Sequence, residues 1–125
     1  LAGYQPQFVL SPKERCDHLD VFAAEFEVPE FPDAKALAAY LYESGYVIGN
    51  DSGVGHLASA LGVPVLTLYR KRRDGFCWRP GWGIGQVVRP IFSLSFMRDR
   101  WAMFMSVNRV ARGFHMLSRR VGGDQ

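Results

Sequence analysis

The feature that most constrains the fold is the stretch from residue 46 to residue 69, where two apolar runs flank a polar turn and a helical pattern. Residues 46–48 predict a buried strand, and residues 65–69 predict a second one. Four apolar residues between them recur at the spacing of one helical face: Val54, Leu57, Ala58 and Leu61. Gly62 is expected to end that helix. A strand, loop, helix and strand in this order is typical of an open parallel α/β sheet.

The turn before this helix has the residues of an anion-binding site. Asp51 and Ser52 directly precede the helix, and Ser52 is predicted to cap it with its side chain. Three glycines are expected to allow unusual dihedrals and close approach of a ligand: Gly49, Gly53 and Gly55. The free amides and the dipole at a helix start favour a phosphate, and His56 in the first turn could reach the same anion. The alternative is an ordinary capped helix with His56 on the surface.

Three consecutive strings in this region resemble the donor-binding motif of the bacterial heptosyltransferases, glycosyltransferase family 9. The strings are Asn50-Asp51-Ser52-Gly53, His56-Leu57-Ala58 and Ala60-Leu61-Gly62-Val63-Pro64. A weaker likeness lies in Trp78-Arg79-Pro80-Gly81. The resemblance implies the GT-B fold, in which two Rossmann-like domains hold a nucleotide sugar between them. Residues 1–125 then correspond to one Rossmann-like nucleotide-sugar-binding domain, expected to be incomplete and to lack the N-terminal acceptor domain and the catalytic base.

The resemblance also implies roles for individual residues. The amides of Ser52 and Gly53, with the Ser52 hydroxyl, would hold the donor diphosphate, Asp51 would meet the sugar hydroxyls, and His56 would support the phosphate side. Glu14 would lie near the ribose and Phe31 against the base; the alternatives are a first-turn carboxylate that stabilises its own helix, and core packing. The implied donor is ADP-heptose and the implied acceptor is the lipopolysaccharide core. Transfer would invert the anomeric centre with no cofactor and no metal.

Charge is divided unevenly along the chain. Residues 1–69 carry 3 basic and 9 acidic side chains, whereas residues 70–125 carry 12 basic and 3 acidic ones. The basic half begins with Arg70-Lys71-Arg72-Arg73, directly after the second strand of the motif. This run could attract an anionic acceptor or a membrane surface, or could be a solvated loop. Because this basic run lies beside Tyr69, Phe76, Trp78 and Trp82, a nucleic-acid-binding module is the rival interpretation, and a non-catalytic assembly remnant is a third.

The remaining pattern predicts further α/β elements. Residues 7–10 and 86–89 read as strands, residues 12–26 as a helix, and Asp33 as the cap of the next helix. The last helix is expected over residues 93–121 with a broad apolar stripe. That stripe predicts a missing N-terminal domain or self-association, unless the helix covers its own sheet.

Neither a signal peptide nor a run long enough to span a membrane is evident. The protein is therefore expected in the cytoplasm, and a peripheral position at the inner membrane is the other location left open. Cys16 and Cys77 have no CxxC spacing and are predicted to be free thiols.

Overall fold

The computed structural model describes residues 3–50, 52–69, 83–89 and 106–123. The chain divides into two compact units, Leu1–Ala36 and Leu37–Gln125. Arg70, Lys71, Arg72 and Arg73 lie outside the described residues, as do Asp51, Cys77 and the predicted helical pattern over residues 93–105. Each unit is described by itself below.

The first unit contains α1 (Pro12–Ala23), which begins with a reciprocal cap. The amide of Glu14 donates to the Ser11 hydroxyl oxygen at 3.3 Å, and the amide of Ser11 donates to the Glu14 carboxylate at 2.8 Å. Behind the helix the ring of Phe8 stacks on Phe22 and meets the edge of Phe26, with centroids 4.6 and 4.8 Å apart. These contacts leave Phe22 half-buried, and no residue of α1 is fully buried.

The strand predicted at residues 7–10 is wrong. The segment is extended but forms no ladder within the described residues. Its main-chain bond to the rest of the first unit runs from the amide of Phe8 to the carbonyl of Glu27, at 3.1 Å. Aromatic packing, rather than strand pairing, therefore accounts for its apolar residues.

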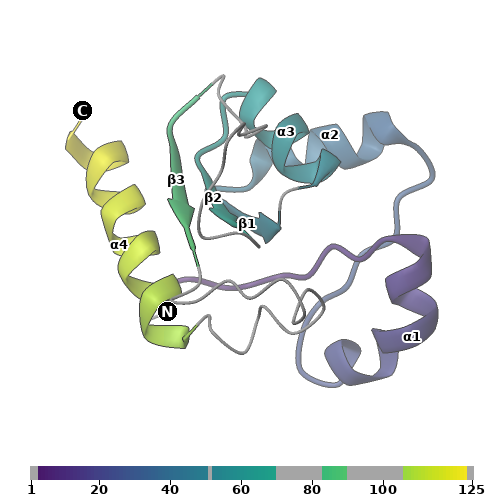
Figure 1. Cartoon of the computed structure of the whole chain (residues 1–125). Coiled ribbons are helices and arrows are strands. Elements are labelled where there is room, and N and C mark those ends of the chain that lie inside the picture. Colours follow the sequence, from purple (N-terminus) through teal and green to yellow (C-terminus); the bar gives the residue numbers. More distant parts are fainter. Residues whose placement is uncertain (1–2, 51, 70–82, 90–105, 124–125) are drawn as a thin grey trace. The chain divides into compact units, whose positions relative to one another are not determined.

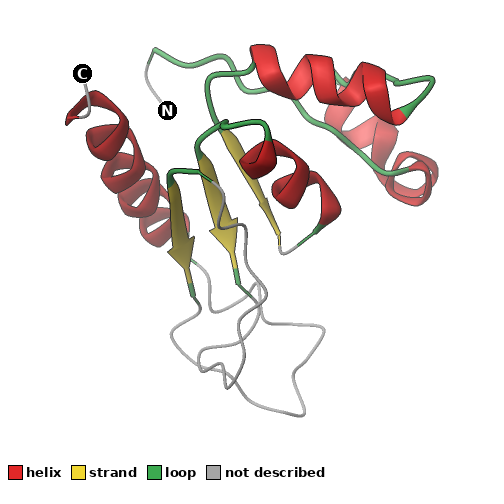
Figure 2. Ribbon diagram, turned by 90° about the horizontal axis from the view of Figure 1, so that it is seen from above, coloured by secondary structure: helices red, strands yellow, loops and turns green. Residues whose placement is uncertain are grey.

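The second unit is built on a parallel sheet with the strand order β1 (Val47–Asn50), β2 (Val65–Leu68) and β3 (Gly85–Val88). Helix α3 (Gly53–Ala60) connects β1 to β2, and α4 (Val107–Gly123) follows β3. Helix α2 (Ala34–Glu43) begins in the first unit, where Asp33 caps it as predicted: the amide of Ala36 donates to Oδ1 at 2.8 Å. The helices α2 and α3 lie on one face of the sheet and α4 on the other (Figures 1 and 2).

Strand β2 supplies alternate side chains to two hydrophobic cores, because successive residues of a strand point to opposite faces. Val65 packs with Ala58 of α3 and Leu41 of α2. Its neighbour Leu66 packs with Phe114 and Leu117 of α4. Leu66 and Leu117 have no exposed surface, and burial of a leucine side chain contributes about 2 kcal/mol. The predicted α/β class with a Rossmann-like parallel sheet is confirmed.

Helix α4 approaches the sheet closely and also covers its edge. A Cβ added at Gly113 would overlap Cγ2 of Val88 and lie 3.1 Å from Cδ1 of Leu66, so only glycine fits at this crossing. Arg109 donates to the carbonyl of Arg89 at 3.1 Å, and Arg120 to the carbonyl of Gly85 at 3.0 Å. Because the carbonyls of Ile84 and Val88 face β2, those of Gly85 and Arg89 face the outer edge of β3. The two arginines thus cover acceptors of an edge strand.

The last helix is shorter than predicted, although a long C-terminal helix is present. Ser106 is not helical, and its hydroxyl oxygen accepts the amide of Arg109 at 3.2 Å, so one continuous helix over residues 93–121 is wrong. Within α4 the apolar face packs on its own sheet, which was the alternative left open by the sequence. Val107 does not widen that face, because it is 83% exposed. No helix within the described residues is long and apolar enough to cross a membrane.

Candidate anion-binding site

The candidate site lies where the parallel strands end. The register aligns Asn50 of β1 with Leu68 of β2, and Leu68 with Val88 of β3, so the carboxyl ends of the strands form one edge. Helix α3 begins at this edge directly after β1. In open α/β sheets, ligands bind in the crevice outside the carboxyl ends of the strands.

Ser52 occupies the N-cap position of α3 but does not cap it with its side chain. Its backbone is extended, with φ −146° and ψ 165°, and its carbonyl accepts the amide of His56 at 3.2 Å. The hydroxyl makes no capping hydrogen bond, so the predicted side-chain cap is wrong. Ser52 and Gly53 are both exposed. The hydroxyl and the first amides of α3 therefore face a common exposed corner in the described part of the second unit.

Gly49 and Gly53 provide room at this corner, whereas Gly55 is buried within α3. Among the described glycines, positive φ occurs at Gly3 and Gly62, so the expectation of unusual backbone angles at Gly49, Gly53 and Gly55 is wrong. A Cβ built at Gly49 or Gly53 meets no described atom within 4 Å. The corner is thus open, and a ligand can approach the main chain where these side chains are missing.

Gly62 ends α3 as predicted. Its φ of 81° lies in the left-handed region, its amide donates to the carbonyl of Ser59 at 3.0 Å, and the amide of Val63 donates to the carbonyl of Ala58 at 3.0 Å. This pair of bonds is a Schellman motif, which lets the chain turn into β2. Val63 is then buried beside Ala58, so the end of the helix is fixed by packing as well as by hydrogen bonds.

His56 lies in the first turns of α3 and is half-buried, with its Nδ1 atom buried. Whether its ring reaches an anion at the helix start stays a prediction. Asp51 lies outside the described residues, and its role in sugar binding stays a prediction.

The two nucleotide contacts predicted in the first unit have structural roles there. Hydrogen bonds from the backbone and then from the side chain of Ser11 hold the pKa of Glu14 below its usual range. Phe31 is half-buried in the segment before α2. Whether either residue contacts a nucleotide stays a prediction, because the two units are described separately.

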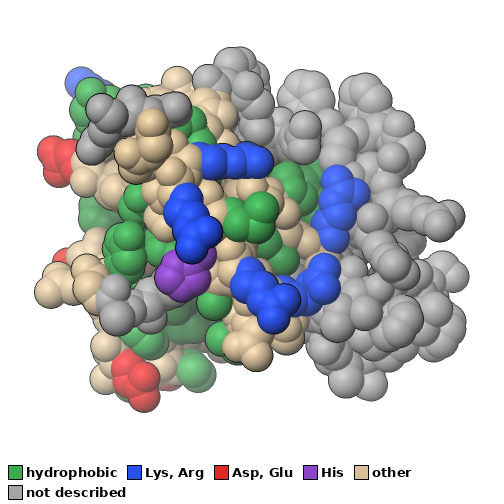
Figure 3. Space-filling model, turned by 90° about the vertical axis from the view of Figure 1, so that its left-hand side faces the viewer, with side chains coloured by type: hydrophobic (Ala, Val, Ile, Leu, Met, Phe, Trp, Pro, Cys, Tyr) green, Lys and Arg blue, Asp and Glu red, His purple; other side chains and the backbone are tan. Residues whose placement is uncertain are grey.

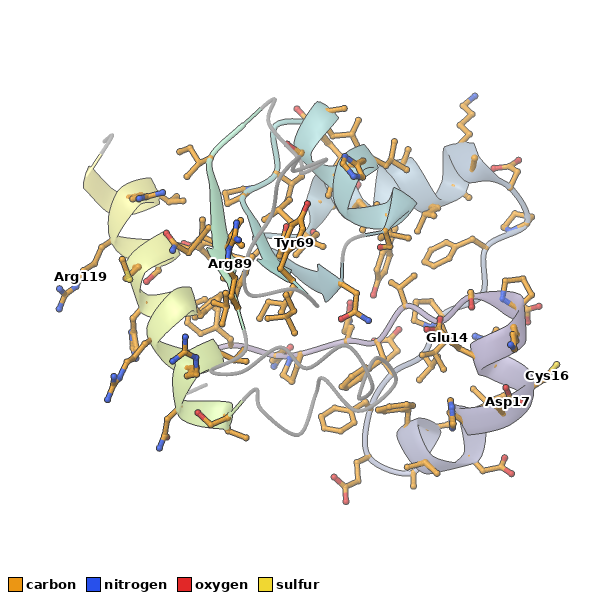
Figure 4. All side chains as sticks on the ribbon, in the orientation of Figure 1. Glu14, Cys16, Asp17, Tyr69, Arg89 and Arg119 are labelled. Atoms are coloured by element: carbon orange, nitrogen blue, oxygen red, sulfur yellow. The ribbon has the colours of Figure 1, made fainter. Side chains whose placement is uncertain are left out.

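The sequence pattern indicated Tyr69 only as an aromatic neighbour of the basic run and did not identify Arg89 as a site residue. The two residues follow β2 and β3 at the candidate edge. The guanidinium of Arg89 lies over the Tyr69 ring, 5.5 Å from its centroid, and Figure 4 shows the two side chains beside one another. The amide of Tyr69 donates to the carbonyl of Val88 at 2.8 Å, which holds the strand ends together. An arginine directly after an apolar strand was the available signal. Arg89 adds positive charge to the edge of the sheet where α3 begins.

A hollow of about 560 Å³ lies at the opposite, amino-terminal edge of β3. It is lined by Gly83, Ile84, Gly85, Arg120 and Gly123. Among the described lining residues the charged side chain is Arg120, and it already bonds the carbonyl of Gly85, so these residues offer little for ligand recognition. We therefore take the exposed corner as the candidate site. No group of three possible metal-ligating side chains gathers within the described residues.

A parallel sheet with helices on both faces and an exposed helix start at its carboxyl edge is the architecture of Rossmann-like, ligand-binding α/β proteins. Residues 32–87 match the family glycosyltransferase family 9 (heptosyltransferase). The matched segment runs from α2 through β1, α3 and β2 into β3, and the match confirms the resemblance seen in the sequence. Comparison with curated proteins and with solved structures gave no match.

Proposed function

We propose that this protein binds a nucleotide-sugar donor, ADP-heptose, for inverting transfer of the sugar to the core of lipopolysaccharide. The observation that carries the proposal is the start of α3, where Ser52 and Gly53 are exposed and the Ser52 hydroxyl is not used to cap the helix. A helix start supplies unpaired amides and a partial positive charge, which suit a diphosphate. The family match supports glycosyl transfer as the reaction class.

In the proposed reaction, a hydroxyl of the acceptor attacks the anomeric carbon of the donor sugar. The bond between that carbon and the diphosphate oxygen breaks, and the nucleoside diphosphate leaves with the electron pair. The amides of Ser52 and Gly53 and the Ser52 hydroxyl would stabilise the charge that grows on the leaving oxygen, with His56 supporting the phosphate. The base that takes the proton of the acceptor hydroxyl is not assigned to a residue of this chain.

The other partners are part of the same proposal. Asp51 would hold the sugar hydroxyls, Glu14 the ribose and Phe31 the base. The run Arg70-Lys71-Arg72-Arg73 would attract the anionic acceptor and allow peripheral contact with the inner membrane from the cytoplasm. A missing N-terminal domain or a second copy would complete the assembly.

The test is binding of ADP and ADP-heptose measured by isothermal titration calorimetry. Ser52→Ala combined with His56→Ala should raise the Kd of ADP about tenfold or more, because hydrogen bonds to charged groups contribute about 1.5–3 kcal/mol each. The matched control is Ser118→Ala combined with His115→Ala, which removes the same groups from α4. The control should bind ADP as the unchanged protein does.

Equal loss of affinity in both double variants would contradict the assigned site. A protein that does not bind ADP, but binds an oligonucleotide in a salt-sensitive manner that is lost when residues 70–73 are neutralised, would favour the nucleic-acid-binding alternative. Binding of neither ligand would favour the assembly remnant.

A further inference from the structure

The outward face of α4 is strongly basic and is not used by the fold. Helix α4 contains four arginines, one histidine and no acidic residue. Arg109 and Arg120 donate hydrogen bonds to main-chain carbonyls at the edge of β3. Arg112, His115 and Arg119 are exposed on the side opposite the buried Gly113, Phe114 and Leu117. We call these three residues the basic stripe.

The basic stripe lies along one line of the helix. Its residues are spaced three and four apart, which places them on one helical face over about 10 Å of axis. Figure 4 shows Arg119 extending away from the sheet, and Figure 3 shows positive side chains gathered on the face that α4 presents. The stripe therefore places two arginine side chains on one face of the helix, with the His115 ring between them.

Little negative charge lies near this surface. The described residues of the second unit include a single acidic residue, Glu43, at the end of α2 on the opposite face of the sheet. The ion pair found within the described residues, Arg15 with Glu30 at 3.7 Å, belongs to the first unit. Among the described residues of the second unit, no acidic side chain therefore lies on the face of the sheet that α4 covers.

One exposed apolar side chain, Met116, lies beside the stripe on α4, whereas Val107 is exposed at the start of the helix on the side of Phe114. Val107 is 83% exposed and Met116 is 52% exposed. Basic residues with an exposed apolar side chain beside them on one helix suit the headgroup region of a membrane with anionic lipids. Single-stranded nucleic acid would require aromatic side chains for stacking, and the aromatic residue of α4, Phe114, is buried in the core.

We propose that the basic stripe of α4 binds the surface of membranes that contain anionic lipids. Contact is peripheral, because the apolar face of α4 stays on the sheet and, of the described apolar side chains of α4, Met116 is the exposed one that adjoins the stripe. This surface is separate from the run Arg70-Lys71-Arg72-Arg73 and from the start of α3. Binding to the membrane requires no nucleotide, so the proposal does not depend on the proposed transferase function.

The experiment is sedimentation of the protein with vesicles of phosphatidylcholine alone or mixed two to one with phosphatidylglycerol. The protein should sediment with the mixed vesicles and remain in solution with the neutral ones. Arg112→Gln combined with Arg119→Gln should lower the partition coefficient about 30-fold, the value expected when each arginine near the surface contributes about 1 kcal/mol. Higher salt should weaken binding of the unchanged protein.

The matched control is Lys13→Gln combined with Lys35→Gln, which removes the same net charge from exposed positions of the first unit. The control should change the partition coefficient less than about threefold. Circular dichroism should show unchanged helix content in both variants, since all four side chains are exposed.

Three outcomes would overturn the proposal. The first is equal loss in the α4 variant and the control, which would indicate a dependence on net charge only. The second is loss of binding on neutralising residues 70–73 with no effect of the α4 substitutions. The third is an oligonucleotide that displaces the vesicles and loses affinity on the same α4 substitutions, which would assign the surface to nucleic acid.

Discussion

Helices α3 and α4 cover opposite faces of β2, and each begins directly after a serine at the carboxyl edge of the sheet. The two serines differ in what their hydroxyls do. The Ser106 hydroxyl oxygen accepts the amide of Arg109 and caps α4, whereas the Ser52 hydroxyl makes no cap. Their glycines differ as well: Gly113 is packed against Val88 and Leu66, whereas Gly53 has open space around it.

This difference indicates that the serine and glycine of α4 serve stability, whereas those of α3 are available for binding. In α4 the cap and the glycine are used by the fold, because they fix the helix start and its close contact with the sheet. In α3 the same residue types at the exposed start leave polar groups and space unused by the described residues. Where no side chain caps a helix start, its first amides remain available to a ligand. This is the physical basis for assigning the site to α3.

The largest effect is expected from Gly113→Ala. The new methyl group would overlap Cγ2 of Val88 and crowd Leu66, and overpacking of this kind costs about 1–3 kcal/mol. We expect the free energy of unfolding to fall by about 2 kcal/mol, measured by urea denaturation followed by circular dichroism.

Gly53→Ala is the matched substitution in α3. A Cβ at this position meets no described atom within 4 Å and the residue has no positive φ, so stability should stay within about 1 kcal/mol of the original. The same methyl group would stand at the proposed phosphate site, and we expect weaker ADP binding by calorimetry. Equal stability losses at Gly113 and Gly53 would remove the structural contrast between the two helices.

The next effect concerns the two serines. Ser106→Ala removes a formed cap and should destabilise the protein by about 1 kcal/mol. Ser52→Ala removes no capping bond and should change the free energy of unfolding by less than about 0.5 kcal/mol. Thermal unfolding of both variants would check this order, and a Ser52→Ala variant as unstable as Ser106→Ala would show that Ser52 serves the fold.

The sequence predicted those elements whose signals are local. The apolar spacing of Val54, Leu57 and Ala58 defined the inner face of α3, and Gly62 marked its end because a left-handed turn favours glycine. The helix predicted across residues 93–121 failed at Ser106, because apolar spacing continues through the cap and cannot by itself locate a helix start.

The sequence predicted where the site lies along the chain, but it did not predict how its side chains are arranged. The order of strand, polar turn and helix located Ser52 and Gly53, but whether the hydroxyl turns toward the helix depends on side-chain conformation, which the spacing does not encode. Tyr69 and Arg89 are twenty residues apart, and only the pairing of β2 with β3 brings them together. Similarly, Arg109 and Arg120 look like ordinary surface residues in the sequence. Their hydrogen bonds to β3 become apparent only once the edge of the sheet is known.

The smallest effect is expected at α1, a third helix that begins with a serine and, like α4, uses it. Hydrogen bonds from Ser11 lower the pKa of Glu14 from its ordinary value of 4.5, and the exposed pair is screened by water, so its contribution is below about 0.5 kcal/mol. An NMR titration of the carboxyl carbon should place the midpoint of Glu14 below 4.5. Ser11→Ala should move the midpoint upward only in part, because the backbone amide of Ser11 remains.

The sign of the pH effect follows from the direction of the shift. Because the pKa of Glu14 is lower in the folded state than in the unfolded one, the cap stabilises the protein fully above the ordinary pKa of 4.5. That stabilisation is lost as the pH falls through the folded pKa. Glu14→Gln should therefore lower stability slightly at neutral pH and remove this part of the acid dependence. A Glu14 midpoint at or above its ordinary value would contradict the capping hydrogen bonds between Ser11 and Glu14. The start of α1 would then lack a side-chain cap, as the start of α3 does at Ser52.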